Sequence, residues 1–72
     1  MKIKYDPEVD AIYIDIIEEK KSVKTIHLSE DIALDFSGNE ELVGIEILDA
    51  SKVIGLERKG KLVLERLEAV AV

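Results

Sequence analysis

Alternation of apolar and polar residues in short runs most constrains what this chain can fold into. Successive side chains of a β-strand point to opposite faces of the sheet, so alternate residues share one face. Residues 11–17 read AIYIDII, and β-branched residues of this kind favour strands. The pattern recurs along the first two thirds of the chain and predicts strands at residues 2–5, 10–18, 23–29, 32–36 and 42–48.

The connections between these runs are too short to hold crossover helices, so neighbouring strands should be antiparallel. Pro7 suits a turn, and the run Ser-Gly-Asn-Glu at residues 37–40 tolerates positive φ. The sequence therefore predicts an α+β domain, an antiparallel meander of about five strands with a short helical turn and a C-terminal helix. Its expected core face consists of Ile3, Tyr5, Ile12, Ile14, Ile16, Ile26, Leu28, Ile32, Leu34, Phe36, Val43, Ile45 and Ile47.

The C-terminal third is expected to cover one face of this sheet. Residues 49–55 read DASKVIG, which predicts a helical turn capped by Asp49 or Ser51 and ended by Gly55. Apolar residues then recur at intervals of three and four, which predicts a helix over residues 61–70. The β-branched residues within that stretch keep a sixth strand open as the alternative.

The chain has 72 residues, so residues 1–72 are expected to form a single domain. A chain of this size buries only about 60% of the surface that its unfolded form exposes. It has no cysteine that could add a disulfide or a thiolate metal site. Self-association is therefore the expected source of further stability, and we expect a homodimer.

The net charge of −6 argues against nucleic acid or an anionic membrane as a partner. It favours a basic protein partner instead. The N-terminus lacks the apolar region of a signal peptide, and no apolar run reaches transmembrane length, so a cytoplasmic protein is expected. Abundant Lys and Glu, with a single Asn and no Gln, are typical of thermophilic proteins.

Asp6, Glu8 and Asp10 have the spacing of ligands in a calcium loop. The EF-hand pattern also needs Gly at its sixth position and Glu at its twelfth, where this chain has Ala11 and Ile17. These acids are therefore interpreted as a solvated turn.

His27 is the single histidine, and alternation turns it away from the core. Neighbouring strands could bring Asp15, Asp35 or Glu46 onto the same face, where a metal or a general base would need them. A solvated polar face is the favoured interpretation, with these four residues kept as weak candidates for metal binding or hydrolysis. No nucleophile elbow and no phosphate-binding glycine motif occurs, so we expect neither an enzyme nor a bound cofactor.

Apolar residues on the otherwise polar second face indicate an interface. Ala11, Tyr13 and Ile17 are the candidates there, and Leu64 and Leu67 are the candidates on the predicted C-terminal helix. The alternative is that this helix covers the patch within one chain.

Two stretches, MKIKYDPEVDAIYI and LVGIEILDASK, resemble the domain of unknown function family 2283, the YuzE-like small bacterial and archaeal proteins. The resemblance covers residues 1–54, whereas residues 55–72 form a C-terminal extension outside it. The chain differs from that family at residues 36–41, FSGNEE, where a short Asp/Gly turn is usual. The resemblance implies no established activity, cofactor or catalytic residue. Some members look as though they are encoded beside small toxins, which implies an antitoxin-like binder of a basic toxin as the alternative function.

Overall fold

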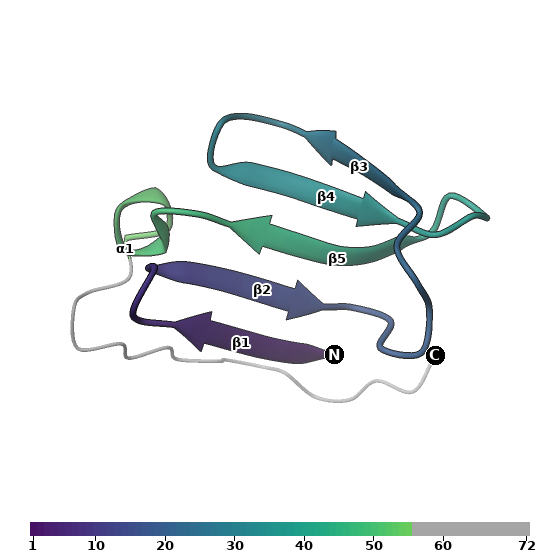
Figure 1. Ribbon diagram of the computed structural model, residues 1–72, viewed down its shortest axis with the longest axis horizontal. Helices are drawn as coiled ribbons and strands as arrows, with labels where there is room; N and C mark the ends of the chain where they lie inside the picture. The colour runs from purple at the N-terminus through teal and green to yellow at the C-terminus, as the bar shows by residue number, and fades with distance from the viewer. Residues whose placement is uncertain (56–72) are drawn as a thin grey trace.

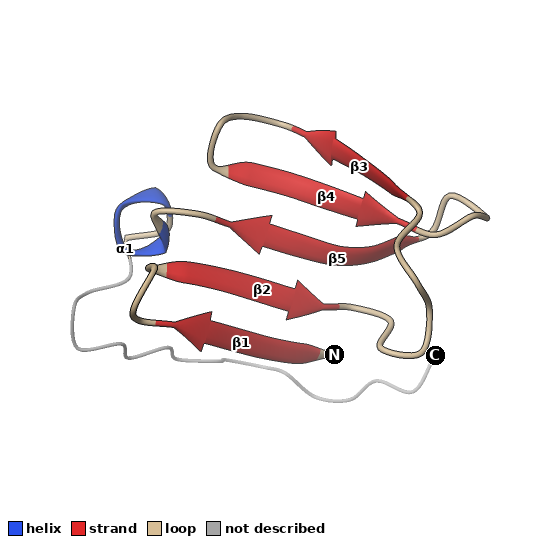
Figure 2. Cartoon of the chain, viewed as in Figure 1, coloured by secondary structure: helices blue, strands red, loops and turns tan. Residues whose placement is uncertain are grey.

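The computed structural model describes residues 1–55, which form five strands and one short helix (Figure 2). The predicted strands are all confirmed, although their ends differ by a few residues. The helix predicted over residues 61–70 lies outside the described residues. The elements are β1 (Lys2–Asp6), β2 (Ala11–Asp15), β3 (Lys24–His27), β4 (Ile32–Phe36), β5 (Leu42–Ile47) and α1 (Ala50–Val53).

The strands form one antiparallel sheet in the order β1-β2-β5-β4-β3 (Figure 1). β3, β4 and β5 follow one another as a meander. The β1–β2 hairpin joins this meander through β2 and β5, so the sheet departs from a simple chain-order meander at that point. This order leaves the lysine-bearing strands β1 and β3 at the two edges of the sheet.

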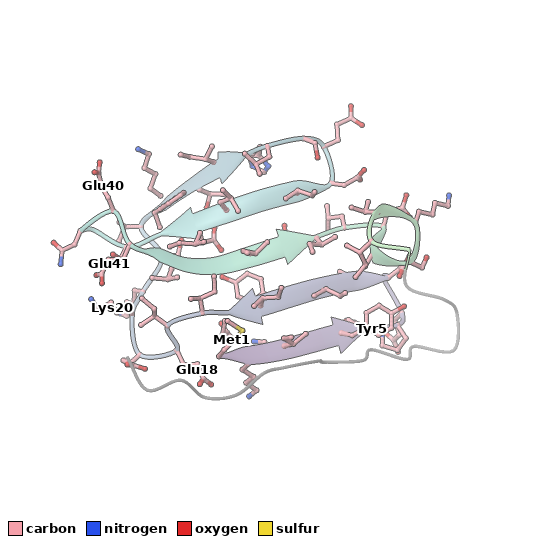
Figure 3. The ribbon with its side chains drawn as sticks, turned by 180° about the vertical axis from the view of Figure 1, so that it is seen from behind. Met1, Tyr5, Glu18, Lys20, Glu40 and Glu41 are labelled. Atoms are coloured by element: carbon pink, nitrogen blue, oxygen red, sulfur yellow. The ribbon has the colours of Figure 1, made fainter. Side chains whose placement is uncertain are left out.

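Residues 16–23 carry the chain from β2 to β3, at the far edge of the sheet. The Ile16 N–H donates to the Val43 carbonyl at 2.8 Å, which fixes the start of this connection. Further along it, the Lys20 ammonium group forms an ion pair with Glu41, just before β5 (Figure 3). The connection is therefore tied to the strand that it passes.

The apolar face of the sheet follows directly from the pairing register. Ile12 lies opposite Ile47 and Ile14 opposite Ile45, so aliphatic side chains meet across the central strands. α1 covers one end of this face, where Ala50 is fully buried against Ile12 and Ile47. The period-2 pattern thus identified the face that α1 packs on.

The rest of this face is more open in the described part of the chain. Ile3, Tyr5 and Ile26 keep 38%, 39% and 41% of their surface exposed. Leu28 was expected in the core, but it lies beyond the end of β3 and is 63% exposed. Ile16 likewise lies beyond the end of β2 and is only half-buried.

The start of α1 differs from the expectation that Asp49 or Ser51 would cap it. Asp49 has a left-handed backbone, with φ of 54°, and its side chain makes no capping hydrogen bond. The cap is Asp10, from the β1–β2 turn. Its carboxylate accepts from the Ser51 N–H at 3.1 Å and the Ser51 hydroxyl at 2.6 Å, and its carbonyl accepts from the Ala50 N–H at 2.8 Å. A capping carboxylate can thus come from a distant loop as well as from the helix itself.

The end of α1 agrees with the expectation. Gly55, with φ of 67°, follows the last helical residues and adopts the left-handed conformation that glycine allows. Within residues 1–55, no helix has the length and apolar character needed to cross a membrane.

Candidate functional site on the polar face

The face opposite α1 carries polar side chains from all five strands. Pairing aligns them in two rows that run across the sheet, so His27, Asp35, Glu46 and Asp15 do share one face, as predicted. One row is Thr25, Asp35, Gly44, Asp15 and Lys2, and the other is His27, Ala33, Glu46, Tyr13 and Lys4.

Asp35 on β4 is the centre of this face. One carboxylate oxygen accepts from the Thr25 hydroxyl at 2.6 Å, and the other accepts from the Tyr13 hydroxyl at 2.6 Å. These hydrogen bonds favour the ionised carboxylate, so the pKa of Asp35 lies below its ordinary value, with Thr25 the largest cause and Tyr13 the next. The charge of His27 on the neighbouring strand acts in the same direction.

Tyr13 reaches Asp35 by crossing over a neighbouring strand. Tyr13 belongs to β2 and Asp35 to β4, and β5 lies between them. The ring passes over Gly44, where a side-chain Cβ would lie only 2.7 Å from the Tyr13 Cζ atom. A glycine inside a strand often marks such a close approach. The hydrogen bond to Asp35, followed by burial, raises the pKa of Tyr13 to about 12.

Lys4 extends the same set of contacts to the edge of the sheet. Its Nζ atom lies 3.1 Å from a carboxylate oxygen of Asp15 and 5.4 Å from the centre of the Tyr13 ring. Contacts therefore run from Lys4 on β1 through Tyr13 on β2 and Asp35 on β4 to Thr25 on β3. We call these four residues, together with Asp15 and Gly44, the polar network.

The weak metal candidates are not gathered around one point. β2 and β3 are separated by two strands, and Asp15 and His27 lie in different rows, so these residues are more than about 14 Å apart at a strand spacing of about 4.8 Å. Both oxygens of Asp35 already accept hydrogen bonds, and Asp15 pairs with Lys4. Within residues 1–55, no group of three His, Asp or Glu side chains could hold a metal ion.

The hydrogen bonds of the polar network join side chains of different strands. The low pKa of Asp35 and the high pKa of Tyr13 keep both groups in one protonation state near neutral pH, whereas a general acid or base works best when its pKa lies near the working pH. The hydrogen bonds instead hold the side chains of strands β2, β3 and β4 in fixed positions.

The structure places the predicted interface residues unevenly. Ala11 and Tyr13 lie on the polar face, and the Tyr13 hydroxyl is already bound to Asp35. Ile17 follows β2 and is half-buried. Leu64 and Leu67 lie outside the described residues.

Sequence reasoning missed the roles of Gly44 and Asp10. Gly44 lies within the strand LVGIEI, and a glycine inside a strand indicates that another group approaches the backbone closely there. The interpretation of Asp10 as one acid of a solvated turn is wrong, because its carboxylate binds Ser51, 41 residues further along the chain. No pattern in the sequence around Asp10 indicates such a distant partner.

One family model matches this chain. A family model described as "Protein of unknown function (DUF2283)" matches residues 2–51. An uncharacterised protein of Methanocaldococcus jannaschii is 45% identical over 58 residues, which cover 81% of this chain and 48% of that protein. The chain thus spans about half the length of this curated relative. No solved structure matches.

Proposed function

Since this chain belongs to the DUF2283 family of proteins of unknown function, we propose its role from its surfaces: it is a small non-enzymatic interaction protein that self-associates through the apolar face of its sheet. The family agrees with the resemblance seen in the two sequence stretches. The proposed contact lies on the face that carries α1, opposite the polar network.

The observation that carries the proposal is the exposure of large apolar side chains on this face. Ile3, Tyr5 and Ile26 are each exposed by more than a third, and Ile14 and Ile45 are only half-buried. Contiguous apolar surface of this kind marks an interaction site in many soluble proteins. Removing apolar surface from water contributes about 25 cal/mol for each Å², and the cost of association is set against this gain.

A second copy of the chain fits this face because the face is aliphatic at its centre. Ile14, Leu34 and Ile45 lie on adjacent strands without a charged residue between them. Two such sheets can pack face to face about 10 Å apart and form a shared core. The polar face is less suited to such a contact, because its charged groups already bind one another.

The test compares two neighbouring substitutions on β3 that place a lysine on opposite faces of the sheet. Ile26→Lys places a charge on the apolar face, whereas the control Thr25→Lys places it on the polar face beside Asp35. By sedimentation velocity at micromolar concentration, we expect a dimer for the wild type and for Thr25→Lys. We expect a monomer, or at least a tenfold weaker dimer, for Ile26→Lys.

A wild-type chain that stays folded and monomeric at every concentration would overturn the proposal. An Ile26→Lys variant that is less stable but sediments with the same mass as the wild type would also overturn it. That result would mean that the apolar face is covered within one chain and not by a second copy.

The alternative function is an antitoxin-like binder of a basic small toxin, and the net charge of −6 favours it. It predicts a complex with the product of the neighbouring gene that weakens as salt concentration rises.

A further inference from the structure

We infer that the outer edge of β1 is a second contact surface, which pairs antiparallel with β1 of another copy in one defined register. β1 lies at the edge of the sheet, and all five of its residues are exposed. Within residues 1–55, no strand pairs with its outer side. Unpaired N–H and C=O groups at an edge are a template for another strand. This contact is separate from the apolar face proposed above. It buries less apolar surface than that face does, so it is the weaker of the two and forms above the micromolar concentrations at which the face-to-face dimer is measured.

The side chains of β1 are complementary to themselves about Lys4. In a two-fold antiparallel pair centred on Lys4, Lys2 lies opposite Asp6 of the second copy, and Ile3 lies opposite Tyr5. Each pair occurs twice because the arrangement is symmetric. Opposite charges and aromatic–β-branched pairs across an antiparallel ladder are both stabilising. In this register the apolar faces of the two sheets lie on the same side of the joined sheet.

Other registers and the other edge are less favourable. Centring the pair on Ile3 would place Lys2 opposite Lys4, and centring it on Tyr5 would pair only residues 4–6 within the strand. A shift by one residue would set polar side chains against the apolar face. The opposite edge, β3, contains no carboxylate in the sequence KTIH and offers no charge pair.

The charged residues of β1 are available in the way that this register needs. Among the described residues, neither Lys2 nor Asp6 takes part in an ion pair, and the contact of Asp6 is a hydrogen bond from the Glu8 N–H at 3.0 Å. The two Lys4 residues would face each other at the centre. Each, however, has its charge 3.1 Å from its own Asp15, which offsets their repulsion.

Disulfide trapping tests the register directly, because the chain has no cysteine of its own. With Lys4→Cys, the two thiols face each other across the ladder, within the Cα separation of about 4.4–6.8 Å that a disulfide needs. We expect mild oxidation to give a covalent dimer in high yield. Lys2→Cys alone should give little, because the two thiols are about 13 Å apart along the strand. A mixture of Lys2→Cys and Asp6→Cys should cross-link.

A charge exchange provides the second measurement. Lys2→Glu or Asp6→Lys alone sets like charges opposite each other and should reduce Lys4→Cys cross-linking at least fivefold. The double variant Lys2→Glu/Asp6→Lys restores the opposite charges and should restore the yield. Equal yields for Lys4→Cys and Lys2→Cys would overturn the inference. So would unchanged cross-linking in the single charge variants, which would mean that the edge lysines only prevent pairing. Thermal melting of every variant separates these results from unfolding.

Discussion

At the scale of single residues, one glycine decides how the polar face is organised. Gly44 lets the Tyr13 ring cross β5 and bind Asp35 on the next strand. The hydrogen bond then depends on the absence of a side chain at position 44. Tyr13 and Gly44 lie 31 positions apart in the chain. Each belongs to one of the two stretches that carry the family resemblance.

Gly44→Ala should therefore destabilise the fold by about 1–3 kcal/mol, because the ring must move to admit the new methyl group. Gly38→Ala is the matched control, since its Cβ would meet nothing closer than a Val23 methyl carbon at 4.0 Å. Urea unfolding measures both. In a Tyr13→Ala background the cost of Gly44→Ala should largely disappear, and a cost that persists there would contradict the role assigned to the ring.

The Tyr13–Asp35 hydrogen bond should also be visible in titrations. The pKa of Tyr13 is raised to about 12, so its contribution to stability is complete below pH 10 and is lost as the pH rises toward 12. Phenolate absorbance should show a tyrosine that ionises near pH 12 and that Tyr13→Phe removes. Asp35→Asn should return this pKa toward 10. A Tyr13 that ionises at the same pH in that variant would argue against the bond.

The Tyr13–Asp35 hydrogen bond also makes the stability of the fold depend on acid pH. The pKa of Asp35 is lowered from 3.8, so its contribution is present above that pH and is lost as the pH falls through the lowered value. Asp35→Asn should therefore unfold with a weaker dependence on acid pH than the wild type does. The pKa of Asp10 is lowered too, first by the Ser51 hydroxyl, so part of the acid dependence should remain.

At the scale of elements, α1 is held by a loop rather than by its own cap. Tyr5 donates to the Asp10 carboxylate at 2.9 Å, and the same carboxylate accepts from Ser51, so β1, the β1–β2 turn and α1 meet at one end of the sheet (Figure 3). A four-residue helix has little stability alone. Its position over Ile12 and Ile47 therefore depends on these contacts.

Asp10→Gly should lower the melting temperature clearly, because it removes the carboxylate and keeps a residue that tolerates the φ of 52° found there. Asp49→Gly is the matched control, with a φ of 54° and no side-chain capping bond. That variant should melt at or above the wild-type temperature. Thermal unfolding followed by circular dichroism compares the two, and equal losses would show that the Asp10 side chain does not hold α1.

At the scale of the whole molecule, the described core is small for a sheet of five strands. Its buried apolar residues are Ile12, Ala33, Val43, Ile47 and Ala50, and most of them lie near α1 and the central strands. A domain that gains part of its core from a partner has a stability that depends on concentration.

The melting temperature should accordingly rise with protein concentration. Each factor of ten in concentration is worth about 1.4 kcal/mol per mole of dimer, which corresponds to several degrees for a domain of this size. Calorimetry or fluorescence melts between micromolar and hundreds of micromolar concentrations would measure the shift. The Ile26→Lys variant should show a much weaker dependence, and a wild-type melting temperature that is constant across this range would contradict self-association.

The sequence alone was sufficient for the strands and their faces. Alternation depends only on the geometry of a single strand, so the residues at positions 12, 14, 45 and 47 could be assigned to one face without knowing their neighbours. The shared polar face of Asp15, Asp35, Glu46 and His27 followed from the same rule. The end of α1 at Gly55 could also be predicted, because the left-handed backbone of a glycine is a local property.

Only the tertiary structure decided which strands are neighbours and which side chains meet. The place of β5 between β2 and β4 depends on the path of a long connection, and nothing local to either strand encodes it. That place brings Tyr13 to Asp35 over Gly44, and it separates Asp15 from His27. It also brings Asp10 to Ser51 and leaves the complementary residues of β1 at an edge. Patterns along a chain fix the direction of each side chain, whereas the contacts between distant side chains exist only once the strands have been ordered.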